Sequence, residues 1–451
     1  MEKQDKHIVI IGGGFGGINL AKKLKNREGL RVTLVDKNNY NFFPPLLYQV
    51  ATGFLDVSSI SMPFRSLFKG VRNLRFRMGE LLEVRPESNS VLLTSGELTY
   101  DALVIATGTV SNFFGMENIK KYGLPMKTID DAVEMRNYLL QKTEEAAALA
   151  PDINSESYRN VVISGAGPTG VEVAGMLAEM RNDILGKIYP EFEASRLQIY
   201  LVDATPTVLP PMREKSQKYT YKALEKIGVK VMLGKMVQDY KDEVVYFKDG
   251  DTIETKTLIW TAGVVAQRFK GIPEQSYSRG NRLLVNDFNQ VEGTDNIYAV
   301  GDVCLQKTDS EFPEGHPQLA NVAMEQGIQL GKNFIAMTKG EPLKPFRYND
   351  KGSMAIIGRN MAVADLTTPN RSFTGWFAWM LWLFIHLFQL INYRNRIKTM
   401  WNWTIAYFTQ DQSLGMIVRP SHRVEEAAAE LSQPARPEKV ESTAASQPAG
   451  E

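Results

Sequence analysis

The sequence contains very little cysteine and histidine. Of its 451 residues, one is a cysteine, Cys304, and four are histidines that lie far apart along the chain. One cysteine cannot form an internal disulfide, a CxxC redox pair or a thiolate metal cage. Histidines without ligand spacing argue against a histidine-rich metal site. We therefore expect no metal and no dithiol that relays electrons.

An excess of charge of either sign is also missing. The chain has 52 Lys and Arg against 51 Asp and Glu, so no basic field indicates a nucleic-acid partner. Residues 1–7 are charged and only a short apolar run follows them, so no signal peptide is expected. With 43% apolar and 23% charged residues, the composition is that of a globular chain with a sizeable core, long enough for two or three domains.

Two stretches share one pattern, in which a short apolar strand leads through a glycine-rich turn into a helix and then into a second strand ending in aspartate. This pattern is typical of a βαβ unit, and its second appearance indicates an internal duplication. The expected strands and helices are residues 7–11, 18–25 and 31–36 in the first unit and 160–164, 171–186 and 197–203 in the second.

In both turns the glycines follow the spacing G-x-G-x-x-G. The first glycine allows a tight turn, the second lets the backbone approach a pyrophosphate, and the third lets the helix pack on the strand. One copy is a weak signal, but two copies in the same setting predict two dinucleotide sites, one for a flavin and one for a nicotinamide cofactor. The residues are Gly12, Gly14, Phe15, Gly16 and Gly17 in the first turn and Gly165, Gly167 and Gly170 in the second.

The second strand of each unit ends in a carboxylate, Asp36 in the first unit and Asp203 in the second. A carboxylate at this position accepts hydrogen bonds from ribose hydroxyls and repels a 2′-phosphate. Asp203 therefore favours NADH over NADPH. The alternative is that both residues are solvated carboxylates at strand ends.

Three further segments, residues 100–109, 257–263 and 296–302, are apolar strands that end in a small-residue turn or in Gly-Asp. With the two glycine turns, they resemble the two-dinucleotide-binding-domain flavoprotein family. In that family the turns close the nucleotide sites and the Gly-Asp aspartate binds the flavin ribityl chain. The resemblance implies that non-covalent FAD contacts Asp36, Lys37, Thr107, Gly108, Gly301 and Asp302, and that NADH contacts Glu172, Asp203, Ala262 and Gly263.

The cysteine count separates the branches of this family. Glutathione-reductase-like, thioredoxin-reductase-like and sulfide:quinone reductases all need two or more cysteines, and this chain has one. Cys304 is interpreted as a small buried residue.

Three features instead resemble the type II NADH dehydrogenases, the single-subunit NADH:quinone oxidoreductases. The first is residues 36–53, similar to the family segment that runs to the isoalloxazine face, with Gln49 near the quinone. The second is Glu172, expected in the first turn of its helix, which in the family lies near nicotinamide and flavin and is implicated in catalysis. Its alternative role is to complement the helix dipole.

The third feature is the segment Ala320–Gly327, which resembles the family quinone motif A-Q-x-A-x-Q-Q-G. Two positions depart from it. Asn321 keeps an amide but has a shorter reach, and Glu325 would place a carboxylate beside the quinone, where it would relay a proton. The alternative is an ordinary helix that packs on the flavin domain.

Five of the six tryptophans lie between positions 376 and 403, and residues 376–391 are almost entirely apolar. A helix of that length spans about 24 Å, less than the roughly 30 Å of a bilayer core. Basic and aromatic residues follow, as expected at a lipid headgroup surface. We expect a monotopic anchor on the membrane surface through residues 376–403. The alternatives are a buried core or dimer helix and a transmembrane span.

The expected fold is α/β, with two Rossmann-like domains, the NAD domain inserted in the FAD domain, and C-terminal amphipathic helices for membrane association. The expected boundaries are 1–125 and 272–370 for the FAD domain, 126–271 for the NADH domain, 371–422 for the membrane region and 423–451 for a disordered tail.

The expected function is non-proton-pumping transfer of electrons from NADH through FAD to a membrane quinone, in a homodimer on the cytoplasmic face of the inner membrane. Two alternatives remain open. One is a reductase for a soluble acceptor, such as a ferredoxin or rubredoxin reductase. The other is a redox-sensing flavoprotein resembling apoptosis-inducing factor.

Overall fold

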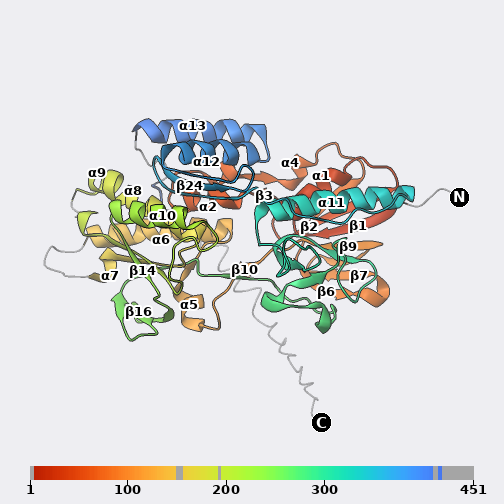
Figure 1. The fold of residues 1–451 in the computed structure, drawn as a ribbon, viewed down its shortest axis with the longest axis horizontal. Coiled ribbons are helices and arrows are strands. Elements are labelled where there is room, and N and C mark those ends of the chain that lie inside the picture. Colours follow the sequence, from red (N-terminus) through yellow and green to blue (C-terminus); the bar gives the residue numbers. More distant parts are fainter. Residues whose placement is uncertain (1–4, 149–155, 191–193, 410–414, 419–451) are drawn as a thin grey trace, which may run out of the picture.

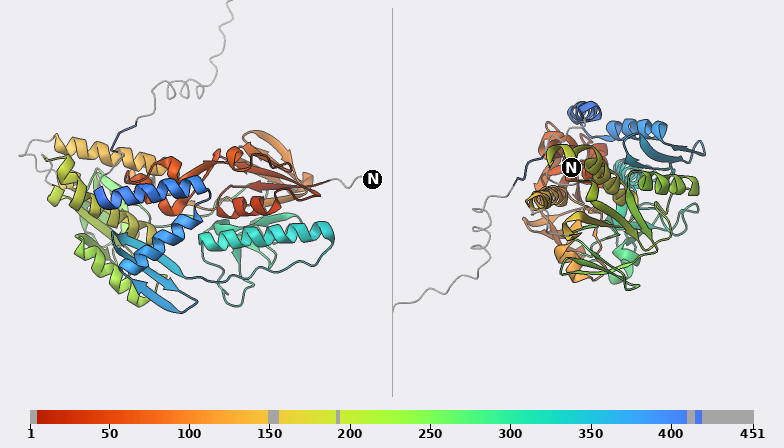
Figure 2. Two further views of the ribbon diagram at one scale, coloured as in Figure 1. Left: turned by 90° about the horizontal axis from the view of Figure 1, so that it is seen from above. Right: turned by 90° about the vertical axis from the view of Figure 1, so that its left-hand side faces the viewer.

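The computed structural model describes residues 5–148, 156–190, 194–409 and 415–418. Two lobes lie side by side, each built around a parallel sheet, and the C-terminal helices lie together on one side of the molecule (Figures 1 and 2). This mixed α/β architecture confirms the expected fold class. The expected tail, residues 423–451, lies outside the described residues.

The first lobe contains a five-stranded parallel sheet in the order β21-β9-β1-β2-β5. Its strands read as near-continuous apolar runs because both faces are covered, and β1 is buried at five of its six positions. The strands are β1 (Lys6–Ile11), β2 (Leu30–Asp36), β5 (Leu74–Met78), β9 (Ala102–Ile105) and β21 (Ile297–Ala299). Helix α1 (Phe15–Leu24) follows the first glycine turn, and α11 (Ala320–Lys339) packs along α1 (Figure 1).

The second lobe repeats this plan, with the sheet order β11-β18-β12-β13-β14. Its strands are β11 (Leu124–Pro125), β12 (Asn160–Ser164), β13 (Gln198–Asp203), β14 (Val229–Leu233) and β18 (Thr257–Trp260). Its helices are α6 (Ile129–Ala147), α8 (Pro168–Glu179) and α10 (Glu214–Lys226), and α8 continues as a π-helix over Met180–Leu185.

The duplication extends beyond the βαβ units. In each lobe a three-stranded antiparallel meander precedes the strand that leads to the small-residue turn, which is β9 in the first lobe and β18 in the second. The first meander is β6 (Leu81–Arg85), β7 (Ser90–Leu93) and β8 (Gly96–Thr99), and the second is β15 (Val237–Lys241), β16 (Val244–Phe247) and β17 (Thr252–Glu254).

A two-stranded ribbon joins the lobes. Strand β10 (Val110–Ser111) follows the small-residue turn of the first lobe, and β19 (Val264–Val265) follows that of the second. The two pair antiparallel, Val110 with Val265 and Ser111 with Val264. The ribbon therefore ties the small-residue turns of the two lobes to each other.

A third, antiparallel sheet lies between the second lobe and the C-terminal helices. It consists of β23 (Ser353–Gly358), β24 (Met361–Leu366) and β25 (Arg371–Thr374), in that order. Strand β23 contacts α8, while β24 contacts α10 and α12. This sheet joins helices α8 and α10 of the second lobe to the C-terminal helices.

The C-terminal helices are α12 (Trp376–Gln389) and α13 (Tyr393–Thr409). Beneath them lies the segment that follows the first lobe's second strand. It contains β3 (Tyr40–Phe42), α2 (Leu47–Ala51), α3 (Val57–Ile60), β4 (Ser61–Pro63) and α4 (Phe64–Leu67). The shorter elements elsewhere are α5 (Glu117–Tyr122), α7 (Glu156–Arg159), α9 (Gly186–Ile188), β20 (Leu283–Val285) and β22 (Cys304–Gln306).

Helix α8 and strand β23 approach each other so closely that only glycine fits at the contact. A Cβ atom on Gly175 would lie 1.6 Å from the carbonyl oxygen of Ile357. We predict that Gly175→Ala lowers the free energy of unfolding by about 3 kcal/mol, the upper end for overpacking, because backbone must move. Urea denaturation measures this.

The matched control is Gly186→Ala, also at a helical position, where an added Cβ would lie 4.0 Å from its nearest neighbour. That variant is expected to gain roughly 0.5–1 kcal/mol from helix propensity. Equal stability of the two variants would contradict the close contact.

Candidate functional site

The two glycine turns have the same geometry. Gly12 and Gly165 adopt φ values of +103° and +110°, which favour glycine. At the third motif positions, a Cβ on Gly17 would lie 1.9 Å from the Gly12 oxygen, and one on Gly170 would lie 1.8 Å from the Gly165 oxygen. Each helix therefore packs onto its own turn with no room for a side chain.

The second glycines differ from the first and third in having open space in front of them. A Cβ built on Gly14 or Gly167 meets nothing within 4 Å, and the same holds for Gly108 in the small-residue turn of the first lobe. Both motif glycines immediately precede a helix. Open backbone at a helix N-terminus is what a bound pyrophosphate requires.

The aspartates that end β2 and β13 hold these turns in place. Asp36 Oδ2 accepts a hydrogen bond from the Gly13 amide at 2.6 Å, and Asp203 Oδ2 accepts one from the Ala166 amide, also at 2.6 Å. Burial raises the pKa of Asp36 against the lowering effect of its backbone hydrogen bonds. The alternative of simply solvated carboxylates is not what the structure shows, although ribose binding stays a prediction.

The small-residue turn of the first lobe contains a polar atom that lacks a partner. The Oγ1 atom of Thr107 is buried and has no hydrogen-bond partner among the described residues. Nearby, Thr109 Oγ1 lies 3.5 Å from Asp302 Oδ2 and accepts a hydrogen bond from Lys127 Nζ at 2.8 Å. An orphaned hydroxyl next to open glycine backbone fits a bound FAD that completes the hydrogen bonding.

Sequence reasoning missed Gln326, the side chain that holds the Gly-Asp turn. Its Oε1 accepts hydrogen bonds from the Gly301 amide at 2.7 Å and from Cys304 Sγ at 3.5 Å. Cys304 is 1% exposed, and burial raises its pKa to about 11. The interpretation of Cys304 as a buried residue is confirmed, and its thiol is a donor in this network.

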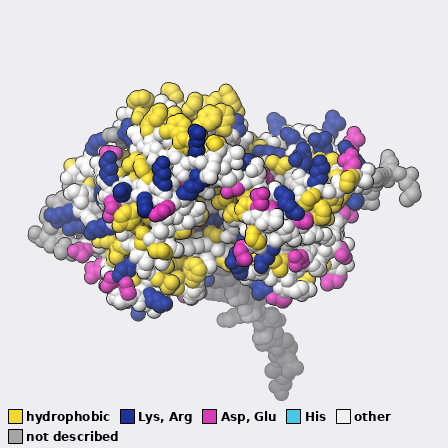
Figure 3. All heavy atoms as spheres, viewed as in Figure 1, with side chains coloured by type: hydrophobic (Ala, Val, Ile, Leu, Met, Phe, Trp, Pro, Cys, Tyr) yellow, Lys and Arg dark blue, Asp and Glu magenta, His cyan; other side chains and the backbone are white. Residues whose placement is uncertain are grey.

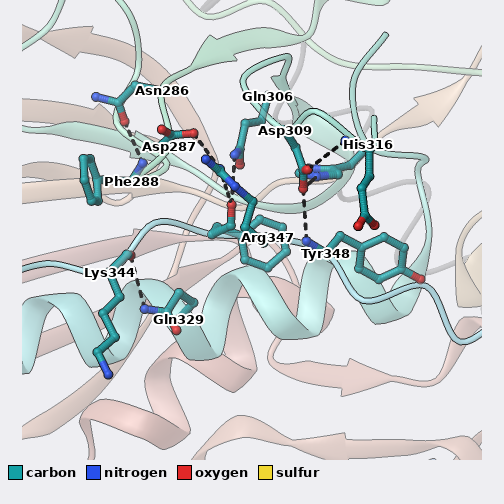
Figure 4. Close-up of polar contacts among 12 residues, drawn as sticks. Asn286, Asp287, Phe288, Gln306, Asp309, His316, Gln329, Lys344, Arg347 and Tyr348 are labelled. Atoms are coloured by element: carbon teal, nitrogen blue, oxygen red, sulfur yellow. Dashed lines mark hydrogen bonds and ion pairs between the residues drawn. The ribbon is translucent and has the colours of Figure 1, made fainter. Parts of the chain in front are cut away.

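A second network fixes the loop between β22 and α11 (Figure 4). The buried Asp309 carboxylate contacts His316 Nε2 at 2.9 Å and accepts a hydrogen bond from the Tyr348 amide at 3.3 Å. The same loop carries Gln318, whose Nε2 donates to the backbone oxygen of Asp302 at 3.0 Å. The loop that this network fixes therefore also holds the backbone of the Asp302 turn.

The two quinone-motif residues on α11 occupy different surroundings. Asn321 is half-buried in the first turn of the helix. Glu325 Oε1 lies 2.5 Å from Lys351 Nζ in an ion pair at partly exposed side chains. Lys351 thus occupies the carboxylate of Glu325, and the expected proton relay at Glu325 stays a prediction.

Glu172 lies on the part of α8 that faces the hairpin formed by β23 and β24. The helix begins at Pro168, where proline fits the first helical position, so Glu172 lies in the second turn. The expectation of a first-turn position was wrong, and the helix-dipole role loses its basis because the dipole effect falls off within the first turn. Burial raises the pKa of Glu172 to about 8, against a lowering by the Ile356 amide.

The side chains of α2 connect this region to the C-terminal helix α13. Trp403 Nε1 donates a hydrogen bond to Gln49 Oε1 at 2.7 Å, and Gln49 Nε2 donates to the Tyr48 hydroxyl at 2.8 Å. Because an indole is only a donor, it fixes which end of the Gln49 amide faces Tyr48. The Tyr48 oxygen therefore accepts, and its own hydrogen remains free to be donated.

Aromatic rings fill the space between the first glycine turn and the C-terminal helices. Phe15 packs edge-on against Phe43 at 5.8 Å, and Phe43 packs against His386 at 6.2 Å. His386 stacks on Trp382 at 3.9 Å between ring centroids. Burial lowers the pKa of His386 to about 4, so its ring is neutral at pH 7.

Helices α12 and α13 have a buried face and an exposed apolar face. Ala378 and Trp382 are fully buried on the inner side. The outer side forms a large apolar surface at the top of the molecule (Figure 3). We call this the apolar cap; it consists of Trp376, Phe377, Met380, Phe384, Phe388, Tyr393, Ile397, Met400, Trp401, Ile405 and Phe408, each at least 41% exposed. Within the described residues, every helix is too short or too polar to cross a membrane.

Comparisons with known proteins agree with this geometry. A family model described as pyridine nucleotide-disulphide oxidoreductase matches residues 6–327, and one described as NDH2 C-terminal domain matches residues 351–410. The first defines the class as an oxidoreductase with two dinucleotide-binding units, which use FAD. The second covers the third sheet with α12 and α13.

Individual relatives narrow the class. The chain is 38% identical to a type II NADH:quinone oxidoreductase of Mycobacterium tuberculosis, covering 89% of this chain and 87% of the relative. It is 31% identical to the Haemophilus influenzae type II NADH:quinone oxidoreductase over 80% of this chain and 87% of that protein. The structure of NDH2 from Plasmodium falciparum in complex with NADH superposes with a TM-score of 0.83 at 21% identity, covering 92% of this chain and all of that one. The chain belongs to the type II NADH:quinone oxidoreductase family.

The orphaned hydroxyl of Thr107 provides a test of the FAD site. We predict that Thr107→Val weakens FAD binding about tenfold, since roughly 1.4 kcal/mol of hydrogen bonding is lost. The affinity is measured from the release of FAD, which is monitored by the rise in flavin fluorescence. Thr220→Val is the matched control because its hydroxyl is also buried without a partner, but it lies on α10. Unchanged FAD release in Thr107→Val would exclude the contact.

Proposed function

We propose that this enzyme oxidises NADH and reduces a quinone that reaches the site from the apolar cap. The observation that carries the proposal is the contact chain from Trp403 through Gln49 to Tyr48. It joins the apolar C-terminal helices to the Glu172 region. A lipid-soluble electron acceptor explains why a nucleotide-binding enzyme presents so large an exposed apolar surface.

FAD, when bound, supplies the two-electron carrier between the two substrates. The residues that would hold it are the first glycine turn with Asp36 and Lys37, the turn at Thr107 and Gly108, and the turn at Gly301 and Asp302. The second glycine turn, with Asp203, Ala262 and Gly263, would hold NADH. The carboxylate of Asp203 favours NADH because it repels a 2′-phosphate.

Glu172 is suited to act as the acid that protonates the reduced quinone. With its pKa raised to about 8, most of its carboxyl is protonated at pH 7. The neutral His386 and the rings of Phe43 and Trp382 give the neighbouring space an apolar wall. Gln49 would orient the quinone only after its hydrogen bonds rearrange, because both ends of its amide are already engaged.

The apolar cap is proposed to rest in one leaflet of the inner membrane, on the cytoplasmic side, as a peripheral anchor. Support comes from the aromatic rings of the cap and from the exposed Arg394, which would meet anionic headgroups. The neighbouring cations are engaged within the protein, Lys398 with Asp56 and Arg396 with the Leu390 oxygen. The alternative of a soluble acceptor offers no role for this surface. The expected homodimer stays a prediction.

A stopped-flow experiment tests the central proposal. The flavin of the wild-type enzyme is reduced by NADH and then mixed with a ubiquinone or menaquinone analogue. Reoxidation is expected to be much faster with quinone than with oxygen, and its rate to fall as pH rises through about 8, where Glu172 loses its proton. We predict that Glu172→Gln slows quinone reoxidation about a hundredfold, the usual size of general-acid catalysis. Reoxidation no faster with quinone than with oxygen would exclude the proposed function.

Flotation with liposomes tests the anchor. We predict that Phe384→Ser together with Phe388→Ser lowers lipid partitioning at least about tenfold, because each buried phenylalanine contributes roughly 1.5–3 kcal/mol. The matched control changes two equally exposed apolar residues far from the cap, Met78→Ser with Leu82→Ser. Equal loss in both pairs would contradict a specific anchoring surface.

A further inference from the structure

Helix α8 carries a second enclosed carboxyl group on the same face as Glu172. Glu179 lies seven residues, or two turns, further along the helix. Between them lies Gly175, the position at which α8 touches the Ile357 oxygen. Glu179 Oε1 accepts a hydrogen bond from the Arg359 amide, at the tip of the β23–β24 hairpin. The carboxyl groups of Glu172 and Glu179 thus both lie along strand β23. The contact between Gly175 and the Ile357 oxygen lies between them.

The surroundings of Glu179 suit a group that exchanges protons near neutral pH. Burial raises its pKa to about 7; Asp183 raises it further, while the amide and the guanidinium of Arg359 lower it. The side chain is half-buried, so it keeps partial access to solvent, as does Asp183. Burial raises the pKa of Tyr48 on α2 well above its usual value, and the negative charges of Glu172 and, less strongly, of Glu179 raise it further.

Quinone reduction by NADH needs such a group because the reaction consumes one more proton than NADH supplies. NADH supplies a hydride, which is two electrons and one proton. The quinone takes up two electrons and two protons, with a new O–H bond on each oxygen. One proton per turnover must therefore come from water and reach the quinone through the enclosed interior.

We propose that Glu179 takes this proton from solvent and passes it along α8 to Glu172, with the Tyr48 hydroxyl between them. As the O–H bond of Glu179 breaks, a new O–H bond forms at the Tyr48 oxygen, and the hydrogen that Tyr48 carried before forms the new O–H bond at Glu172. Glu172 then gives its proton to a quinone oxygen, and Glu179 takes up the next proton from water. This role of Glu179 rests on the proposed quinone reduction and assigns one further residue to that reaction.

The hydrogen bonding around Tyr48 supports the order of these groups. The Tyr48 oxygen accepts from Gln49, so its hydrogen is free for a carboxylate on α8. Burial raises the pKa of both carboxyl groups towards neutral pH, so each of them can take up and release a proton in the working range.

The position of Glu179 is also linked to helix α13. The Arg359 side chain donates through Nη2 to the backbone oxygen of Tyr407, and its guanidinium lies 4.3 Å above the Tyr407 ring. The residue whose amide holds Glu179 therefore also holds the last turns of α13. Arg359 therefore contacts both the carboxyl group that would take up the proton and helix α13.

The test uses the FAD-loaded enzyme and the variant Glu179→Gln, which keeps an oxygen for the Arg359 amide but carries no proton. Reduction by NADH is expected to be unchanged, because hydride transfer takes up no solvent proton. Reoxidation by a quinone analogue at pH 7.5 is expected to be about tenfold slower, and small weak acids such as imidazolium are expected to restore part of the rate. In the infrared spectrum, the variant is expected to lose a protonated-carboxyl band that titrates near pH 7.

Two matched variants accompany it. Asp183→Asn removes a negative charge beside Glu179, which lowers the pKa of Glu179, so the alkaline decline of the reoxidation rate is expected to move to lower pH. Glu214→Gln, at an exposed position on α10, is expected to change nothing.

The proposal is overturned if Glu179→Gln is reoxidised by quinone as fast as the wild type, or if both half-reactions slow equally and weak acids restore neither. Melting temperature and flavin content establish that the variant is folded and loaded. Failure of the wild type itself to be reoxidised by quinone would instead remove the proposed function.

Discussion

The close approach of α8 to β23 at Gly175 is the contact on which the rest of the site depends. A side chain there would collide with the Ile357 oxygen, so the helix that starts at the nucleotide turn lies directly on the C-terminal sheet. The sheet in turn contacts α10 and α12. The backbone amide of Arg213 and the hydroxyl of Ser216, both at the start of α10, donate hydrogen bonds to the Asp365 carboxylate of β24 at 2.7 Å each. The second lobe and the C-terminal helices are thus packed together through this sheet, and α8, which carries Glu172 and Glu179, contacts it directly.

The C-terminal helices serve two environments at once. On the inner side they supply Trp382, His386 and Trp403, which close the space above α2 and fix the Gln49 amide. On the outer side they leave the apolar cap uncovered. An enzyme with a water-soluble first substrate and a lipid-soluble second one benefits from having both faces on the same helices. Only one layer of helices then separates the apolar surface from the buried side chains above α2.

The features that were predictable from the sequence depend on local rules. The glycine turns, their flanking strands and the terminal aspartates follow from what each position demands of its own backbone. The start of α8 was misplaced because Pro168 was read as part of the turn, which put Glu172 in the wrong helical turn. Gln326 matches the last glutamine of the quinone motif, but the motif does not indicate that this amide binds the Gly301 backbone N–H, and only the packing of α11 on that turn shows it. The Gln49–Trp403 hydrogen bond joins residues 354 positions apart, and only the packing of α13 on α2 brings them together.

The paired strands β10 and β19 give the molecule a property that neither lobe has alone. Two lobes joined by single flexible strands would open and close around their ligands like the halves of a hinge. Here the two crossing segments are hydrogen-bonded to each other, so a rotation of one lobe has to carry the other segment with it. The pairing therefore opposes a rotation of one lobe against the other, and it links the small-residue turns of the two lobes directly.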